Sequence, residues 1–233
     1  MPSLLDEEFS IAAVLPRASR KDVLIGKESG GLEGLRRGAK VATSSVRRRR
    51  LLESMRPDLE IVDIRGNVPT RIRKLRESEE LEGLLLAKAG LCRLELLHDG
   101  VVDSGGEVLY VEELDETVFV PAAGQGAVGI EFRETDQRVR DLLAPVHHED
   151  TATRVLAERA VVRRLDGGCD VPIAAFAEFD GDGLWLRARV GATDGTSLLE
   201  AEARGADPEQ LGQSVAEMLL SQGAEDLIRA ARG

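Results

Sequence analysis

Between residues 22 and 97 the sequence alternates between short runs of strand-forming residues and helical segments. Strands are expected at residues 23–25, 40–43, 59–64 and 83–87, and helices at residues 46–55, from Pro69 onward and after residue 87. This alternation predicts a parallel sheet, because parallel neighbours are joined by a crossover that is usually a helix. In an open sheet of this kind, ligands bind at the edge where the parallel strands end. The residues that follow each strand are therefore the first candidates for a binding site.

Arginine recurs at three of these strand-to-helix junctions. The junctions read TSSVRRRR at residues 43–50, RGNVPTR at residues 65–71 and AKAGLCR at residues 87–93. Positive charge in the first turn of a helix opposes the helix dipole, at a cost of about 0.3–1 kcal/mol per exposed residue, and a bound anion would offset it. A single arginine is more often part of a surface salt bridge, but three junctions at one edge favour a site for several carboxylates or phosphates. The candidates are Arg47, Arg48, Arg65, Arg71 and Arg93.

The charge balance limits what such a site could bind. The chain has 233 residues and a formal net charge of −11, with 31 basic residues, mostly arginine, against 42 acidic ones. An acidic, lysine-poor surface indicates adaptation to high salt, as in a halophile, since screening relaxes the repulsion of a large net charge. The same charge argues against general nucleic-acid binding, which depends on a basic face. We therefore expect the arginines to bind a small molecule.

The chain carries no recognisable membrane or export signal. No apolar run approaches the roughly 20 residues that span a membrane. The N-terminus is acidic and lacks the basic start and apolar centre of a signal peptide. These features predict a cytoplasmic protein that does not bind membranes, and Cys92 and Cys169 would then stay reduced.

The C-terminal third has a different pattern. A helix is expected at residues 150–165, followed by strands at residues 172–179, 184–191 and 197–204 and a final helix at residues 208–222. The connections DGDG at residues 180–183 and Asp194-Gly195 are strong hairpin signals. This region therefore predicts an α+β domain with a three-stranded antiparallel sheet. Residues 101–113, with a Gly105-Gly106 turn, are also expected to form strands.

Cys169 lies in the sequence LDGGCDVP at residues 165–172, on a loop between the expected helix and strand. Gly167 and Gly168 are expected to end the helix, because glycine supplies a left-handed C-cap. A structural cysteine more often lies within an apolar run. Thiol reactivity depends on surroundings that a sequence barely shows, so an accessible reactive thiol and an unreactive loop cysteine are both open.

Two further motifs are interpreted as structural. GQGAVG at residues 124–129 matches the dinucleotide pattern G-x-G-x-x-G, but a strand follows it where the fingerprint requires a helix. Close backbone packing is the better interpretation. His147 and His148 are adjacent, whereas a zinc site needs three or four converging ligands, so no metal is expected and capping of the next helix by Asp150 or Thr151 is preferred.

Taken together, these motifs resemble the porphobilinogen deaminase family, also called hydroxymethylbilane synthase. The resemblance runs through nearly the whole chain and rests on TSSVRR, RGNVPTR, AGLCR, PAAGQGAVG at residues 121–129 and LDGGCDVP, in that order. It implies a transferase of porphyrin (haem) biosynthesis that condenses four porphobilinogen molecules head to tail into hydroxymethylbilane, with loss of ammonia. It also implies a dipyrromethane cofactor joined by a thioether to Cys169.

The resemblance also implies roles for the junction residues. Thr43, Ser45, Arg47 and Arg48 would bind the cofactor, and Arg65 and Gly66 would bind cofactor or substrate. Arg71 and Arg93 would bind the carboxylates of the substrate or the growing chain. Each porphobilinogen carries an acetate and a propionate, which suits guanidinium groups. The alternative is a non-catalytic module that binds small anions.

One departure from the family concerns its catalytic aspartate, which belongs to a Lys-Asp-x-Pro motif. Met1 and Pro2 would align with the last two residues of that motif, so the Lys and Asp would precede the first residue. We expect this chain alone not to complete catalysis. Either an internal methionine was taken as the start of a longer protein or the chain is a genuine remnant, and the intact binding motifs favour the first.

The expected fold class is α/β, with a doubly wound domain like those of periplasmic binding proteins at residues 20–112. Residues 1–19 and 113–146 would be the remnant of a sister domain, and residues 147–233 the α+β domain that carries the cofactor attachment site. The protein is expected to be a monomer.

Overall fold

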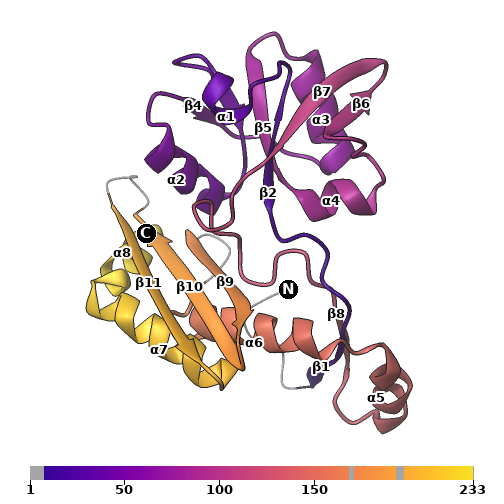
Figure 1. Ribbon diagram of the computed structural model, residues 1–233, viewed down its shortest axis with the longest axis vertical. Coiled ribbons are helices and arrows are strands. Elements are labelled where there is room, and N and C mark those ends of the chain that lie inside the picture. The colour runs from indigo at the N-terminus through magenta and orange to yellow at the C-terminus, as the bar shows by residue number, and fades with distance from the viewer. Residues whose placement is uncertain (1–7, 168–170, 193–196, 233) are drawn as a thin grey trace. The chain divides into compact units, whose positions relative to one another are not determined.

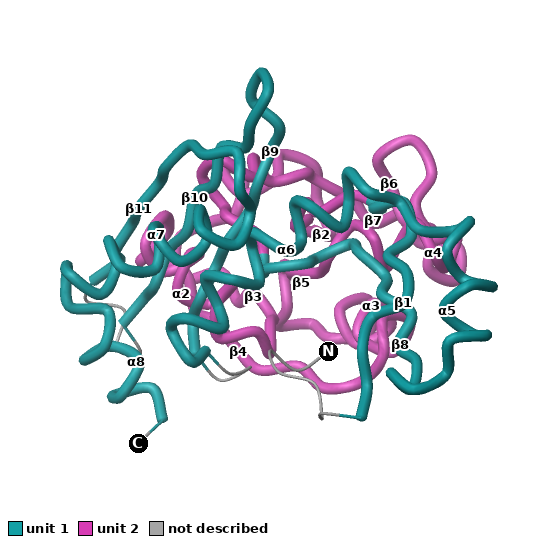
Figure 2. The backbone as a smooth tube through the Cα atoms, turned by 90° about the horizontal axis from the view of Figure 1, so that it is seen from below, with its two compact units in different colours: residues 1–18, 122–233 teal, residues 19–121 magenta. Residues whose placement is uncertain are grey.

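The computed structural model describes residues 8–167, 171–192 and 197–232. The chain divides into two compact units, of which unit 1 combines residues 1–18 and 122–233 and unit 2 comprises residues 19–121 (Figure 2). Among the described residues no helix is long and apolar enough to cross a membrane.

Unit 2 is built on a six-stranded mixed sheet in the order β4-β3-β5-β2-β7-β6. The strands are β2 (Asp22–Gly26), β3 (Lys40–Ala42), β4 (Glu60–Val62), β5 (Leu81–Ala87), β6 (Val101–Ser104) and β7 (Glu107–Glu113). β3 is parallel to β4 and β5, as the sequence predicts. β2 is antiparallel to β5 and β7, which corrects the expectation of an all-parallel sheet. The alternation of strands and helices identifies the strands, but it does not fix the direction in which β2 enters the sheet.

Helices lie on both sides of this sheet (Figure 1). They are α1 (Gly31–Gly34), α2 (Val46–Met55), α3 (Val68–Glu77) and α4 (Lys88–Arg93). On one face Ile72 and Leu75 of α3 and Leu91 of α4 are buried against alternate residues of β2 and β5. The period of two along buried strands places the remaining side chains on the other face. The hairpin of β6 and β7 turns at Gly105 and Gly106, which have φ values of 68° and 88°.

Unit 1 contains two separate sheets. β1 (Phe9–Val14) pairs antiparallel with β8 (Gly129–Arg133), and α5 (Gln137–Leu143) and the 3-10 helix η1 (Ala144–Val146) follow. The second sheet, in the order β11-β10-β9, is antiparallel throughout, as predicted. Its strands are β9 (Ile173–Asp180), β10 (Gly183–Gly191) and β11 (Leu198–Gly205).

Three helices cover one face of the three-stranded sheet. They are α6 (Glu149–Arg164), α7 (Pro208–Ser221) and α8 (Ala224–Arg232), and their apolar residues share one core with the strands. The sequence predicts the first two helices. It misses α8, because Gly223, with φ 99°, ends α7 and a second short amphipathic helix follows it.

Two local expectations about α6 are wrong. His148, and not Asp150 or Thr151, is the N-cap, and its ring nitrogen accepts a hydrogen bond from the Thr151 amide. At the other end the left-handed residue is Asp166, with φ 50°, and not Gly167. Gly167 lies close to other atoms instead: a Cβ there would lie 2.3 Å from Cδ1 of Ile173, so that side chain would have to shift.

Candidate functional site

The three arginine-bearing junctions share one edge of the unit 2 sheet. Because β3, β4 and β5 are parallel neighbours, their carboxyl ends lie at the same edge. The antiparallel β2 brings its first residue to that edge, where Asp22 pairs with Ala87 at the end of β5. A carboxylate therefore joins the arginines at the place where the sequence predicts a ligand.

Hydroxyl groups order the first junction. Thr43 is buried, and its hydroxyl accepts a hydrogen bond from the Ser45 amide at 3.2 Å. Ser45 is the N-cap of α2 and accepts from the Arg48 amide at 3.4 Å. The Ser44 hydroxyl donates to the carbonyl of Ile64, which links this junction to the second one. The start of α2 is thus fixed by short polar side chains, as expected for an N-cap.

Asp22 binds the first two arginines of α2. Its Oδ2 and Oδ1 accept from Nη1 and Nη2 of Arg47 at 2.7 and 3.1 Å, and Oδ1 also accepts from Nε of Arg48 at 2.7 Å. Arg47 Nη1 donates in addition to the carbonyl of Val120 at 2.8 Å. The side chains of Arg47, Arg48 and Asp22 are only 6%, 11% and 0% exposed. This is a buried ion-pair cluster and not a solvated basic face.

Among the described ion pairs of the cluster, two guanidinium groups share one carboxylate. Burial by itself would raise the pKa of Asp22, but Arg47 and Arg48 outweigh burial and hold that pKa below its usual value. The pKa of Arg48 is lowered, first by burial and then by the charges of Arg47 and Arg71, against the opposing effect of Asp22. Two guanidinium groups thus face one buried carboxylate, and the charge of Arg71 acts on Arg48.

The second junction is a tight turn. Gly66 has φ 125°, a conformation that favours glycine, and its carbonyl accepts from Nε of Arg71 at 2.7 Å. Asn67 caps α3 by accepting from the Thr70 amide at 3.0 Å. Arg65 is exposed, and within the described part of the chain its side chain has no hydrogen bond or ion pair.

The third junction contributes less to the cluster. Arg93 is exposed and is the last residue of α4, about 1.7 helical turns beyond the end of β5. Lys88, at the start of that helix, forms an ion pair with Glu113 of β7. The structure therefore brings together Thr43, Ser45, Arg47, Arg48, Gly66 and Arg71, whereas Arg65 and Arg93 are exposed residues at the same sheet edge.

The glycine-rich segment after residue 121 forms two tight turns in unit 1. Gly124 and Gly126 have φ values of 72° and 82°, and no helix begins there. The Gly124 amide donates to Oε2 of Glu158 at 2.7 Å, and Nε of Arg17 donates to the Gln125 carbonyl at 2.9 Å. These contacts agree with close backbone packing and not with a dinucleotide fingerprint.

Cys169 lies outside the described residues. The described chain before it ends at Gly167, where the neighbouring Asp166 accepts from Nη2 of Arg232 through its carboxylate at 2.8 Å and through its carbonyl. Cys92 is exposed and free. Among the described residues, no three side chains of His, Cys, Asp or Glu gather as a metal site would require.

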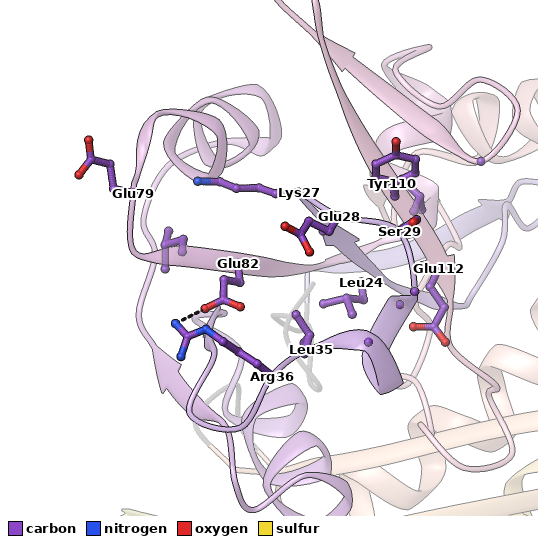
Figure 3. A pocket seen from close by; sticks show the side chains of 17 residues that line it. Leu24, Lys27, Glu28, Ser29, Leu35, Arg36, Glu79, Glu82, Tyr110 and Glu112 are labelled. Atoms are coloured by element: carbon purple, nitrogen blue, oxygen red, sulfur yellow. Dashed lines mark ion pairs between the residues drawn. The ribbon is translucent and has the colours of Figure 1, made fainter.

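A cavity of about 690 Å³ lies in unit 2 but away from the junctions (Figure 3). It is lined by Gly26, the last residue of β2, and by Leu81 and Glu82 at the start of β5, so it lies toward the opposite edge of the sheet. Glu28, Glu79, Glu82 and Glu112 line it, against the two cations Lys27 and Arg36. An excess of carboxylates does not suit an anionic ligand.

Sequence reasoning missed Asp22. Asp22 follows Lys21 at the start of a strand, and a charged residue at such a position is commonly solvated. The signal that could have found it is the need to neutralise several arginines at the beginning of α2. Its partners are 25 and 26 residues away, and the contact depends on the antiparallel direction of β2.

Comparisons with known proteins identify the family. Residues 1–141 match the model described as "Porphobilinogen deaminase, dipyromethane cofactor binding domain", and residues 152–221 match "Porphobilinogen deaminase, C-terminal domain". Porphobilinogen deaminases from Listeria welshimeri and Listeria innocua are 43% and 41% identical over 232 residues, which cover 100% of this chain and 72% of each relative. The solved structure of YhfZ from Shigella flexneri matches 69% of this chain and 66% of its own, with 14% identity and a TM-score of 0.31.

The fold is that of a mixed α/β protein whose strand-to-helix junctions gather arginines at one sheet edge. The two family models together identify that class further: the chain belongs to the porphobilinogen deaminase family. This enzyme, hydroxymethylbilane synthase, acts on porphobilinogen in tetrapyrrole biosynthesis and uses a dipyrromethane cofactor. The donor set fits that cofactor, because hydroxyls, amides and an excess of guanidinium groups are the partners that carboxylates require.

Proposed function

We propose that the edge of the unit 2 sheet binds the carboxylates of the dipyrromethane cofactor and of the growing pyrrole chain. The observation that carries the proposal is the unbalanced cluster in which Asp22 faces Arg47 and Arg48 while Arg71 adds a further positive charge. A buried excess of positive charge is costly unless an anion compensates it. A ligand with an acetate and a propionate on every ring supplies such anions.

The contacts support a proposed role for each of these residues. Thr43 and Ser45 order the start of α2, and Arg47 and Arg48 present positive charge there to the cofactor. Gly66 allows the chain to turn so that Arg71 folds back over it. Arg65, Arg71 and Arg93 are proposed to bind substrate carboxylates, and Arg65 and Gly66 the cofactor as well. No described residue is proposed as the catalytic acid.

Cys169 is proposed to attach the cofactor through a thioether. The family match and the position of the residue between α6 and β9 support this assignment. When bound, the cofactor supplies the primer to which porphobilinogen units are added. The chain itself supplies the anchoring sulfur and the guanidinium groups that hold the carboxylates in place.

The domain organisation proposed with this function has three parts. Residues 20–112 would form a doubly wound domain of the periplasmic-binding-protein type, and residues 147–233 the attachment domain. Residues 1–19 and 113–146 would belong to a sister domain, which the pairing of β1 with β8 supports. A cytoplasmic monomer that binds a small molecule, without nucleic acid or membrane, completes the proposal.

Intact-protein mass spectrometry tests the proposal. The chain is produced in a host that makes porphobilinogen, and the mass of the purified protein is measured. We expect a covalent dipyrromethane adduct that disappears in Cys169→Ser and persists in Cys92→Ser, since Cys92 is exposed but belongs to no attachment loop. An unmodified Cys169 in otherwise folded protein would favour a non-catalytic anion-binding module instead.

A further inference from the structure

We propose that Asp22 is a positioning residue of the cofactor site, which holds the guanidinium groups of Arg47 and Arg48 in place before the ligand arrives. The inference rests on the proposed function of this sheet edge. It assigns a role to a fully buried residue whose own charge has the wrong sign for binding carboxylates.

The backbone fixes where the carboxylate lies. Asp22 is the first residue of β2, between β5 and β7 in the sheet. It pairs with Ala87 on one side, and its carbonyl accepts from the Leu114 amide at 3.0 Å on the other. Its side chain is fully buried. A carboxylate on a central strand, held from both sides, has little freedom to follow the arginines, so the arginines must adjust to it.

The contacts define the orientation of two long side chains. Arg47 donates both terminal nitrogens to the two oxygens of Asp22, a bidentate geometry, and also bonds to the Val120 carbonyl. Its guanidinium lies 6.0 Å from the centre of the Phe119 ring. Arg48 is held through Nε at 2.7 Å, which fixes the plane of its guanidinium. Arginine loses much rotamer freedom when it binds a ligand, and a preorganised arginine has already lost it on folding.

A positioning role and simple electrostatics predict opposite changes in ligand affinity for one substitution. In Asp22→Asn the site becomes more positive, so Coulomb attraction alone would tighten the binding of an anion. If Asp22 positions the arginines, the same substitution weakens binding, because the amide replaces one of the two acceptor oxygens by an NH2 donor, which cannot accept from Arg47 and breaks the bidentate contact. The sign of the change therefore separates the two explanations.

The experiment measures reversible binding of a synthetic dipyrromethane that carries an acetate and a propionate on each ring. Calorimetric titration is done in a Cys169→Ser background, so that no thioether forms. We expect Asp22→Asn to weaken binding by about tenfold or more, as for the loss of a hydrogen bond to a charged group. The matched control is Glu80→Gln, which makes the same change in net charge near the opposite edge of the sheet and should leave the affinity unchanged.

A second variant covers the case in which Asp22→Asn does not fold. Asp22→Glu keeps the charge but moves the carboxylate outward by one methylene, so it should fold better and still bind more weakly. The loss should persist at high salt, where a purely Coulombic effect would fade. A lower melting temperature with an unchanged dissociation constant would show a merely structural role and overturn the proposal, as would tighter binding in Asp22→Asn.

A measurement on the unsubstituted protein does not depend on the folding of any Asp22 variant. The Nε proton signal of Arg48 is assigned by its loss in Arg48→Lys. This proton should exchange slowly with solvent in the ligand-free protein, and its signal should keep its position when the dipyrromethane is added. Fast exchange before ligand binding would contradict positioning. If the Cys169→Ser parent does not bind the dipyrromethane, the proposed function fails; if the parent binds and the Asp22 variants bind equally well, only the positioning role fails.

Discussion

Arg17 and Glu158, 141 residues apart, form a buried bidentate ion pair in unit 1, with Nη1–Oε1 and Nη2–Oε2 distances of 2.7 and 2.9 Å. The two side chains are 5% and 0% exposed. Glu158 also accepts from the amides of Gly124 and Ala177, at 2.7 and 3.0 Å. One carboxylate thus joins the segment before unit 2, the glycine-rich segment after it, and the first strand of the three-stranded sheet.

We expect Glu158→Gln to destabilise unit 1 strongly. The substitution leaves Arg17 buried without its counter-charge, and breaking a buried pair costs about 3–5 kcal/mol. The free energy of unfolding from urea titration checks this. Glu225→Gln is the matched control, because Glu225 pairs with Arg229 at 73% and 71% exposure and an exposed pair contributes at most about 1 kcal/mol. Equal effects of the two substitutions would show that burial of the Arg17 pair is not what matters.

Asp58 provides a prediction about pH. Hydrogen bonds from Arg56, at 2.8 Å to each carboxylate oxygen, are the main cause that lowers its pKa from 3.8 to about 2. A folded-state pKa below the unfolded value means that the contribution of Asp58 to stability is complete above about pH 4. It is lost as the pH falls toward 2. The stability difference between the wild type and Asp58→Asn should shrink over this window.

Carbon-detected NMR of the Asp58 carboxyl group measures its titration directly. A midpoint near the ordinary value of 3.8 would contradict the assignment. Arg56→Gln should move the midpoint upward toward that value, since it removes both hydrogen bonds.

Much of the fold could be predicted because it depends on local sequence. Ser45 and Asn67 cap α2 and α3 as their residue types suggest, and the arginine junctions follow from where three strands end. The direction of β2 could not be predicted, because nothing within the strand distinguishes the two directions. The consequence for the site concerns Asp22, which reaches Arg47 and Arg48 because β2 lies antiparallel beside β5.

Contacts across long stretches of sequence escaped prediction for the same reason. Glu158 lies on a helix whose pattern indicates only amphipathic packing, and its partner Arg17 belongs to a short connecting segment. The N-cap of α6 was not predicted, because Asp and Thr are better-known capping residues than His. In the structure the ring nitrogen of His148 accepts the capping hydrogen bond. Local propensity decides which residues can cap, whereas the backbone angle at each position decides which one does.

Gly212 should be intolerant of alanine although it lies within a helix. Alanine in place of an interior helical glycine normally stabilises by up to about 1 kcal/mol. In α7, however, a Cβ at this position would lie 2.4 Å from Cβ of Ala160 and 2.5 Å from the carbonyl oxygen of Ala157, both on α6. The two helices would have to separate, so we expect Gly212→Ala to destabilise by about 1–3 kcal/mol, as overpacking does.

Thermal unfolding of Gly212→Ala beside Ser214→Ala measures this. Ser214 is exposed on the same helix, and its replacement should be neutral or slightly stabilising. A raised melting temperature for Gly212→Ala would mean that α6 and α7 are less closely packed than the contact indicates.

Gly66 provides a prediction about both stability and the proposed ligand binding. It has φ 125°, and an added Cβ would lie 2.7 Å from Cγ2 of Thr70, while its carbonyl holds Nε of Arg71. Gly66→Ala should therefore cost about 1–3 kcal/mol of stability through strain and should also displace Arg71 and weaken dipyrromethane binding. Gly38→Ala is the matched control, because Gly38 has φ 76° but no atom within 4 Å of an added Cβ, so strain alone should lower its stability. Urea titration and dipyrromethane calorimetry on both variants separate the effects: loss of affinity in Gly66→Ala with normal affinity in Gly38→Ala is the expected result, and equal affinities would remove the second junction from the site.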